Sequence, residues 1–330
     1  MIKRSGRTRN TEYHQVLILS VLMFCLVLVS VFSLFIGVEP LDVRNLFRPD
    51  THDNEILLIS RVPRTVTLVL TGAGLAICGV IIQQLAQNKF ISPTTTGTLD
   101  AAKLGILFGL LLFSQSGLLP KLVFGVFFCF SLTALFTFSI AHFVKRNTVL
   151  IPIFGVMYGY TLNALANVIG VHFNMVQNME SWMIGNFSKT LKGQYEVIYI
   201  LIPLFVICYL YANRFTIVGL GKDFTANMGV NYPVVISVGL ILTSIMVSTT
   251  MLTVGSIPFI DLVIPNLVSL IHGDNLRQNL PYTACYGAIT LVVCDIIGRT
   301  IIFPYEIPGS MIVGSLGALV FLFILIKRGR

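Results

Sequence analysis

The sequence predicts an all-α integral membrane protein built as a polytopic bundle of about ten transmembrane helices. Hydrophobic residues make up 55% of its 330 residues and charged residues only 11%, whereas about 25% of the residues in a typical soluble domain are charged. Apolar runs of about 20 residues follow one another along the chain, and a helix needs ~20 residues to cross ~30 Å of hydrocarbon. So few charges cannot cover a surface exposed to water, so we expect the chain to lie in a bilayer.

Charged residues and Pro or Gly breaks divide the chain into ten candidate spans. They cover residues 16–38, 62–83, 94–112, 121–143, 149–172, 195–212, 233–253, 257–272, 281–302 and 308–326. The first has no charge and no A-x-A cleavage pattern near its end, so we expect a retained span and not a signal peptide. The eighth is short and contains Pro258, Asp261 and Pro265, so a broken or re-entrant helix is an alternative there.

The basic residues predict the orientation, because Lys and Arg stay on the cytoplasmic side of membrane proteins. With the N-terminus inside, the cytoplasmic segments carry 13 basic residues and three acidic ones. The basic residues are Lys3, Arg4, Arg7, Arg9, Lys89, Lys145, Arg146, Arg214, Lys222, Arg277, Lys327, Arg328 and Arg330. We therefore expect one transmembrane domain over 1–330 with a basic N-terminus at 1–15 and both termini cytoplasmic. The net charge of +8 then reflects topology and does not require a nucleic acid partner.

Motifs of membrane enzymes are missing from the sequence. It contains no H-E-x-x-H zinc motif and no G-x-S-x-G nucleophile elbow. A G-x-x-x-x-G-K-[ST] phosphate loop is also missing, so any ATP would be used by another subunit. The six cysteines lie in apolar runs without a C-x-x-C pair, which is typical of buried small side chains. We expect no catalytic residue, no metal site and no bound cofactor in this chain.

Two pairs of charged residues at helical spacing fall inside predicted spans, where charge is costly and often functional. Asp100 and Lys103 are three residues apart, and Asp295 and Arg299 are four apart. Both spacings place the partners on one helical face. One interpretation is two self-neutralising intramembrane pairs, and the other is the proton relay of a secondary transporter.

Three blocks of sequence carry a resemblance to a known family. The first is Arg61-Val-Pro-Arg64, followed by Thr71-Gly-Ala-Gly-Leu-Ala, Gly79, Gln83, Asn88 and Ser92-Pro93. The second is Gly255-Ser-Ile-Pro-Phe-Ile-Asp-Leu-Val-Ile-Pro-Asn266, then Gly273-Asp274, Arg277, Leu280-Pro281 and Asp295 to Arg299. The third is Glu306-Ile-Pro-Gly with Gly314-Ser-Leu-Gly-Ala. In this order they resemble the FecCD-type permeases, the importers of iron–siderophore, haem and cobalamin.

The resemblance implies a type II ABC importer permease fold, with ten helices in each subunit. Residues 94–105 look closer to the catecholate-type ferric siderophore branch of Gram-positive bacteria than to the cobalamin branch. The implied partners are a second permease subunit, identical or related, a cytoplasmic ABC ATPase dimer that uses ATP, and an extracytoplasmic siderophore-binding lipoprotein. The chain would lie in the bacterial cytoplasmic membrane and pass ferric siderophore, with the iron held by its chelator. The alternatives are a haem or cobalamin permease, a proton-coupled secondary transporter and a membrane enzyme acting on a lipid.

The resemblance also implies an ATPase coupling segment at 213–232. Glycines bracket the central stretch, in which Leu220, Phe224 and Met228 recur every four residues and so share one helical face. By resemblance this face binds a groove of the ATPase. The coupling residues are Gly219, Leu220, Gly221, Phe224, Ala226, Met228 and Gly229.

Two further sites are implied by resemblance alone. A cytoplasmic gate would include Asn88 and Phe90, which an extended loop would point to one side, opposed by Asn147 and Thr148; a solvated turn is the alternative. Outer docking residues would be Arg61, Arg64 and Arg299, forming salt bridges with glutamates of the binding protein. Alternatively these arginines extend to lipid headgroups, or Arg299 pairs with Asp295.

Overall fold

The computed structural model describes residues 3–37, 39, 52–93, 95–113, 118–143 and 150–328. The long helices in these ranges are α1 (Lys3–Phe35), α3 (Val62–Leu85), α4 (Thr98–Leu112), α5 (Leu118–Phe143), α6 (Leu150–His172), α8 (Leu201–Gly219), α10 (Tyr232–Val254), α11 (Ile260–His272), α12 (Leu276–Thr300) and α13 (Gly309–Arg328). The short elements are α2 (His52–Ile56), α7 (Val176–Met183), α9 (Lys222–Asn227), the π-turn η1 (Leu57–Arg61) and the 3₁₀ turns η2 (Phe187–Lys189) and η3 (Glu196–Ile200). Each predicted span corresponds to one long helix, so the predicted all-α bundle is confirmed.

Hydropathy and length show which helices suit a bilayer. Among the described residues, six helical stretches are long and apolar enough to cross a membrane: Gln15–Phe35, His52–Leu85, Ile153–His172, Glu196–Gly219, Tyr232–Val254 and Leu276–Thr300. Shorter apolar stretches lie in α5, α11 and α13. The predicted break in the eighth span is present, because Phe259 has a left-handed conformation with φ 68° and α11 begins only after it. With 13 residues, α11 is about 20 Å long.

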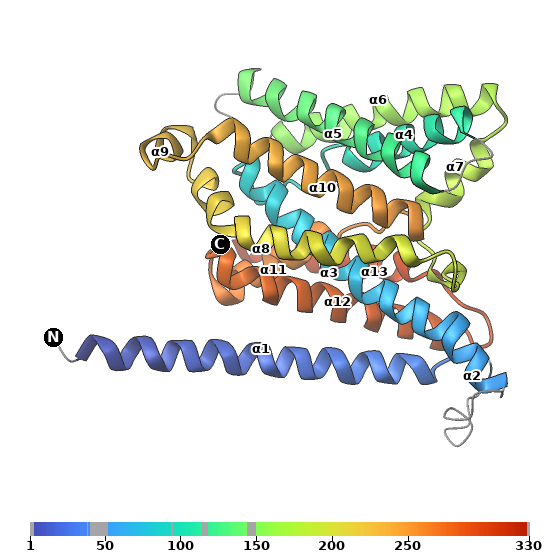
Figure 1. Ribbon diagram of the computed structural model, residues 1–330, viewed down its shortest axis with the longest axis horizontal. Coiled ribbons are helices and arrows are strands. Elements are labelled where there is room, and N and C mark those ends of the chain that lie inside the picture. Colours follow the sequence, from blue (N-terminus) through green and yellow to red (C-terminus); the bar gives the residue numbers. More distant parts are fainter. Residues whose placement is uncertain are drawn as a thin grey trace.

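Helix α3 lies at the centre of the bundle, with α1 along one edge and α6 along the opposite edge (Figure 1). Within the stretch His52–Leu85, which ends in α3, the apolar segment of 18 residues is 83% buried, whereas the corresponding segment of α1 is only 6% buried. We call each of these segments the apolar window of its helix. Close packing of α3 depends on small residues: a Cβ on Gly72 would collide with the backbone of Gly287 in α12, and a Cβ on Gly79 with the backbone of Asp261 in α11. Small residues permit such close approach where lipid gives no hydrophobic driving force between helices.

The bundle has two ends, which we name by their short helices. At the α9 end, Gln87 Nε2 donates to the Val218 carbonyl over 3.5 Å, and Lys89 Nζ lies 2.6 Å from Asp274 Oδ1. At the α2 end, the Lys192 N–H donates to the Ile59 carbonyl over 2.9 Å. Helix α1 begins and α13 ends toward the α9 end (Figure 1). This arrangement determines which functional segments share a side of the membrane.

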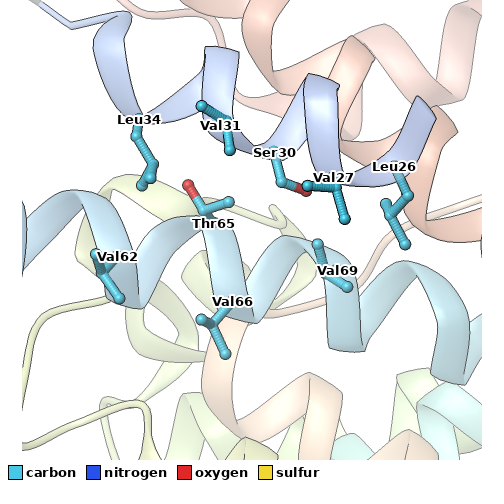
Figure 2. A pocket seen from close by; sticks show the side chains of 9 residues that line it. All are labelled: Leu26, Val27, Ser30, Val31, Leu34, Val62, Thr65, Val66 and Val69. Carbon is cyan, nitrogen blue, oxygen red and sulfur yellow. The ribbon is translucent and has the colours of Figure 1, made fainter. Parts of the chain in front are cut away.

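A groove of about 300 Å³ separates the C-terminal half of α1 from the start of α3. It is lined by residues 26–34 of α1 and 62–69 of α3, as Figure 2 shows. Ser30 and Thr65 supply the only side-chain polar atoms of this lining. The groove is therefore an apolar surface of the kind that hydrocarbon covers.

Candidate functional site

The predicted coupling segment forms a compact turn and helix at the α9 end. After α8 ends, the Thr225 hydroxyl bonds the carbonyls of Gly221, at 2.6 Å, and Ile217, at 3.1 Å. Thr225 is completely buried. Leu220, Phe224 and Met228 are 61%, 46% and 57% exposed. The prediction of one continuous helical face is wrong, because Gly221 with φ 110° separates Leu220 from α9. The three apolar side chains are nevertheless exposed, and exposed apolar residues can mark an interaction site.

The glycines of this segment have distinct conformational tasks. Gly221 and Gly229 have φ of 110° and 69°, a region that costs other residues energy. A Cβ on Gly219 would collide with the Gln84 side chain of α3. Ala226 lies exposed on α9. The glycines therefore determine where α9 begins and ends relative to the bundle.

The predicted gate loop between α3 and α4 is a turn and not an extended strand. Asn88 is 7% exposed, and its Oδ1 accepts the N–H of Phe90 at 2.9 Å. Phe90 is 36% exposed, and its ring meets that of Phe321 edge-on at a centroid distance of 6.3 Å. The expectation that both side chains point to one side is wrong, because the Asn88 side chain folds back to close the turn. Asn147 and Thr148 lie outside the described residues.

The gate loop is also tied to α11. Lys89 Nζ donates to the Ser269 hydroxyl at 2.8 Å, in addition to its ion pair with Asp274. The Asn266 amide donates to the Lys89 carbonyl at 2.8 Å. The half-length helix α11 and the loop therefore form one connected unit at the α9 end.

At the α2 end, Asp295 of α12 lies between two arginines. Arg64 Nη2 is 2.8 Å from Asp295 Oδ1, and Arg299 Nη2 is 2.9 Å from Asp295 Oδ2. Arg64 Nη1 also lies 2.8 Å from Glu306 Oε2, which accepts the Ser188 hydroxyl at 2.7 Å. The side chains of Asp295 and Arg299 are 1% and 3% exposed. Two carboxylates thus neutralise two arginines inside the protein, and we call these four charged residues the charge network.

The loop carboxylate of the charge network is stabilised in its charged form. Burial raises the pKa of Glu306, but the Ser188 hydroxyl and the Arg64 guanidinium outweigh burial and hold this pKa below its ordinary value. Glu306 therefore remains charged at neutral pH.

Arginines also cap the end of α1. Arg299 Nη1 donates to the Ser33 and Ile36 carbonyls at 3.1 and 2.7 Å. Arg61 Nη1 donates to the Leu34 carbonyl at 2.9 Å, and Arg61 Nη2 to the Glu39 carbonyl. The last carbonyls of a helix lack intrahelical donors and carry partial negative charge, so cations stabilise them. Arg61 and Arg299 therefore hold α1 to the bundle.

The three predicted docking arginines thus already have partners within the chain. Arg61 and Arg299 are 6% and 5% exposed, and the Arg64 side chain is 11% exposed. Their docking role stays a prediction, and a partner carboxylate would have to compete with Asp295 or Glu306. Their observed contacts are structural.

The second predicted charge pair is arranged differently. Lys103 is fully buried; its Nζ donates to Asn163 Oδ1 of α6 at 3.0 Å and lies 3.6 Å from Glu180 Oε1 of α7. Within the described part of the chain, Asp100 does not form an ion pair with Lys103, and its carboxylate lies beside Gly159 of α6. Lys103 therefore connects α4 to α6 and α7 instead of being neutralised within its own helix.

The charge network supports a prediction about stability. Replacing Asp295 with Asn should leave two buried arginines without their shared carboxylate and lower the free energy of unfolding by about 3–5 kcal/mol. Denaturant unfolding of the purified protein in detergent measures this loss. Asp223→Asn, on exposed α9, is the matched control and should change stability by less than about 0.5 kcal/mol. Equal stability of Asp295→Asn and the wild type would contradict the role of the network.

Comparison with known proteins gives the family. Residues 21–327 match the FecCD transport family. The petrobactin import system permease protein YclN of Bacillus subtilis is 44% identical over 309 residues, which cover 93% of this chain and 97% of that protein. The ferric-anguibactin transport system permease protein FatD of Vibrio anguillarum is 43% identical over 274 residues, which cover 83% of this chain and 87% of that protein.

The fold agrees with these matches. A chain from an inward-facing structure of a metal-chelate type ABC transporter superposes with a TM-score of 0.79 and 23% identity, covering 94% of this chain and 99% of that chain. At this identity the likeness concerns the fold alone. Because the family match extends from within α1 to the end of α13, this chain belongs to the FecCD transport family.

Proposed function

We propose that this chain is the permease subunit of an ABC importer that passes a ferric siderophore of the catecholate type across the bacterial cytoplasmic membrane. The observation that carries the proposal is the 44% identity, over 93% of the chain, to a permease named for petrobactin import. A second relative is named for ferric-anguibactin. Two relatives named for siderophore transport favour this cargo over haem or cobalamin.

The proposed energy source lies outside the chain. The sequence contains no phosphate loop, and Leu220, Phe224 and Met228 are exposed apolar side chains on α9 and the turns that flank it, as expected of a helix that binds a partner groove. We assign this surface to a cytoplasmic ABC ATPase dimer, which uses ATP. The further proposed partners are a second permease subunit, identical or related, and an extracytoplasmic siderophore-binding lipoprotein.

The orientation follows from the two ends. We assign the α9 end to the cytoplasm, because predicted cytoplasmic basic residues lie there: Lys222 begins α9, Lys89 pairs with Asp274 just before α12, and Arg277 lies in the first turn of α12. Both termini are then cytoplasmic, since α1 begins and α13 ends toward this side (Figure 1).

The iron is treated as part of the cargo. Among the described residues, no group of three or more His, Cys, Asp or Glu side chains could hold a metal ion. We therefore propose that Fe(III) crosses inside its chelator and does not exchange onto the permease.

Reconstitution tests the proposal as a whole. The chain, its second permease and an ABC ATPase are placed in proteoliposomes with the binding protein and ⁵⁵Fe-labelled siderophore. Uptake should require ATP hydrolysis and the ATPase. Uptake driven by a pH gradient without the ATPase would instead support a proton-coupled transporter. Inhibition of uptake by haem or cobalamin would indicate that one of these compounds is the cargo.

The coupling face gives a sharper prediction. Phe224→Asp should introduce a charge into an apolar contact and reduce co-purification with the ATPase about tenfold or more. Phe224→Leu keeps the face apolar and should retain both co-purification and uptake. Normal assembly and uptake by Phe224→Asp would show that this face does not bind the ATPase.

The gate prediction now concerns Phe90. Because Phe90 is exposed and Asn88 is buried, a cysteine at 90 should react with a thiol reagent at a rate that differs between resting and ATP-trapped transporter. A cysteine at 88 should react slowly in both states. Identical labelling of residue 90 in every state would exclude a gate at this loop.

The docking prediction can be tested while the central carboxylate of the network, Asp295, stays in place. Glu306→Gln removes the more exposed carboxylate from Arg64 and leaves Asp295 in place. If Arg64 receives a glutamate of the binding protein, the affinity for that protein should rise about two- to fivefold, the size of a rim ion pair. Surface plasmon resonance at two salt concentrations measures the change. An unchanged affinity would leave Arg64 with a purely structural role.

A further inference from the structure

A second cleft, at the α9 end, has no part in the function proposed above. It lies between α1, α8 and α12 and has a volume of about 370 Å³. Gln15 of α1 and Arg277 and Gln278 of α12 line it, together with Leu19, Tyr209 and Tyr282. The cleft therefore combines amide and guanidinium groups with apolar and aromatic walls.

The polar and apolar groups of this cleft are ordered along the helices. On α1, Gln15 comes one turn before Leu19; on α12, Arg277 and Gln278 come about one turn before Tyr282. From the α9 end toward the middle of the helices, the walls formed by α1 and α12 thus change from polar to apolar over ~5 Å. This is the polarity gradient between lipid headgroups and acyl chains.

Arg277 is the charged residue of this cleft. Its side chain is exposed, and its guanidinium carbon lies 5.9 Å from the centroid of the Tyr209 ring. Among the side chains that the structure describes, no carboxylate forms an ion pair with Arg277, whereas Arg64 pairs with two and Lys103 with one. An exposed cation at the boundary between the apolar helices and the cytoplasmic segments can pair with an anionic headgroup.

The walls of the cleft are held in place by hydrogen bonds. Gln15 Nε2 donates to Gln278 Oε1 at 3.3 Å, and the Tyr282 hydroxyl donates to the Gln15 carbonyl at 2.8 Å. These bonds join α1 to α12 at the inner end of the bundle. The site is therefore formed before any ligand binds.

The surroundings favour a lipid over a soluble anion. Helix α1 forms the edge of the bundle (Figure 1), and only 6% of its apolar window is buried. The other groove of α1, against α3, is apolar and without charge (Figure 2). Both grooves offer apolar walls that suit an acyl chain, but of the two only the cleft at Arg277 has a charged lining residue that can distinguish one headgroup from another.

We propose that the Arg277 cleft binds an anionic glycerophospholipid, with its phosphate at the Arg277 guanidinium and an acyl chain along Leu19 and Tyr282. Basic pockets between transmembrane helices recognise anionic headgroups in this way. A bound lipid would fill the space between α1, α8 and α12 and neutralise Arg277.

Native mass spectrometry of the full-length protein in detergent tests the site. Wild-type protein should retain phosphatidylglycerol in preference to phosphatidylcholine with the same acyl chains. Arg277→Gln should weaken phosphatidylglycerol retention roughly fivefold, the effect of one basic residue near an anionic surface, and leave phosphatidylcholine unchanged. Arg277→Lys should retain most of the preference. No transport is measured, so the result is independent of the proposed function.

Arg214 provides the matched control. It also lies on the α9 side of α8, with its guanidinium carbon 5.0 Å from the Tyr211 ring centroid, but it does not line the cleft. Arg214→Gln should bind phosphatidylglycerol like the wild type. Equal loss in both Gln variants, or wild-type retention by Arg277→Gln, would overturn the site. Displacement of the lipid by millimolar inorganic phosphate would identify a free-anion site and overturn the lipid assignment.

Discussion

The α2 end of this protein depends on the position of Asp295 between Arg64 and Arg299. Hydrocarbon offers no water to a charged side chain, so each buried charge must be neutralised by the protein. The desolvation cost of these ions is offset only while all partners are present. Asp295 thereby fixes the start of α3 against the end of α12, and every contact made by the two arginines depends on that geometry.

Helix α1 shows how far this constraint extends. Its apolar window is only 6% buried, so apolar packing alone holds it weakly to the bundle. Hydrogen bonds from Arg61 and Arg299 to the carbonyls at its end attach it at the α2 end, and the Tyr282 hydroxyl attaches it near the α9 end. A helix that faces lipid on most of its surface is thus held at both ends by polar contacts.

Local patterns in the sequence were sufficient to predict the long helices. Apolar runs predict spans because the bilayer imposes one length on every helix, and the break before α11 follows from Pro258 and its neighbours. The glycines between Gly219 and Gly229 indicated a turn and a short helix, but the four-residue spacing wrongly extended one helical face to Leu220, because Gly221 breaks the helix there.

The ion pairs depend on tertiary contacts and were not predictable in the same way. Arg64 meets Asp295 and Glu306 across 231 and 242 residues, and no spacing rule reaches that far. Lys103 was paired by spacing with Asp100, but α6 and α7 supply Asn163 and Glu180 instead. Asn88 was placed in an extended loop, whereas its side chain forms a turn with the Phe90 N–H, the usual preference of asparagine in loops.

The two ends differ in a way that matches two kinds of partner. At the α2 end Arg64 and Arg299 are engaged by the chain's own carboxylates, so a docking protein that binds them would exchange one ion pair for another and gain little net energy. Contacts of that kind form and dissociate readily and weaken with salt. At the α9 end, Leu220, Phe224 and Met228 are exposed apolar side chains. A partner can bury them without breaking an existing ion pair. Because burial of apolar area stabilises in proportion to that area, the α9 end suits a long-lived subunit, and the α2 end suits a protein that arrives, delivers and leaves.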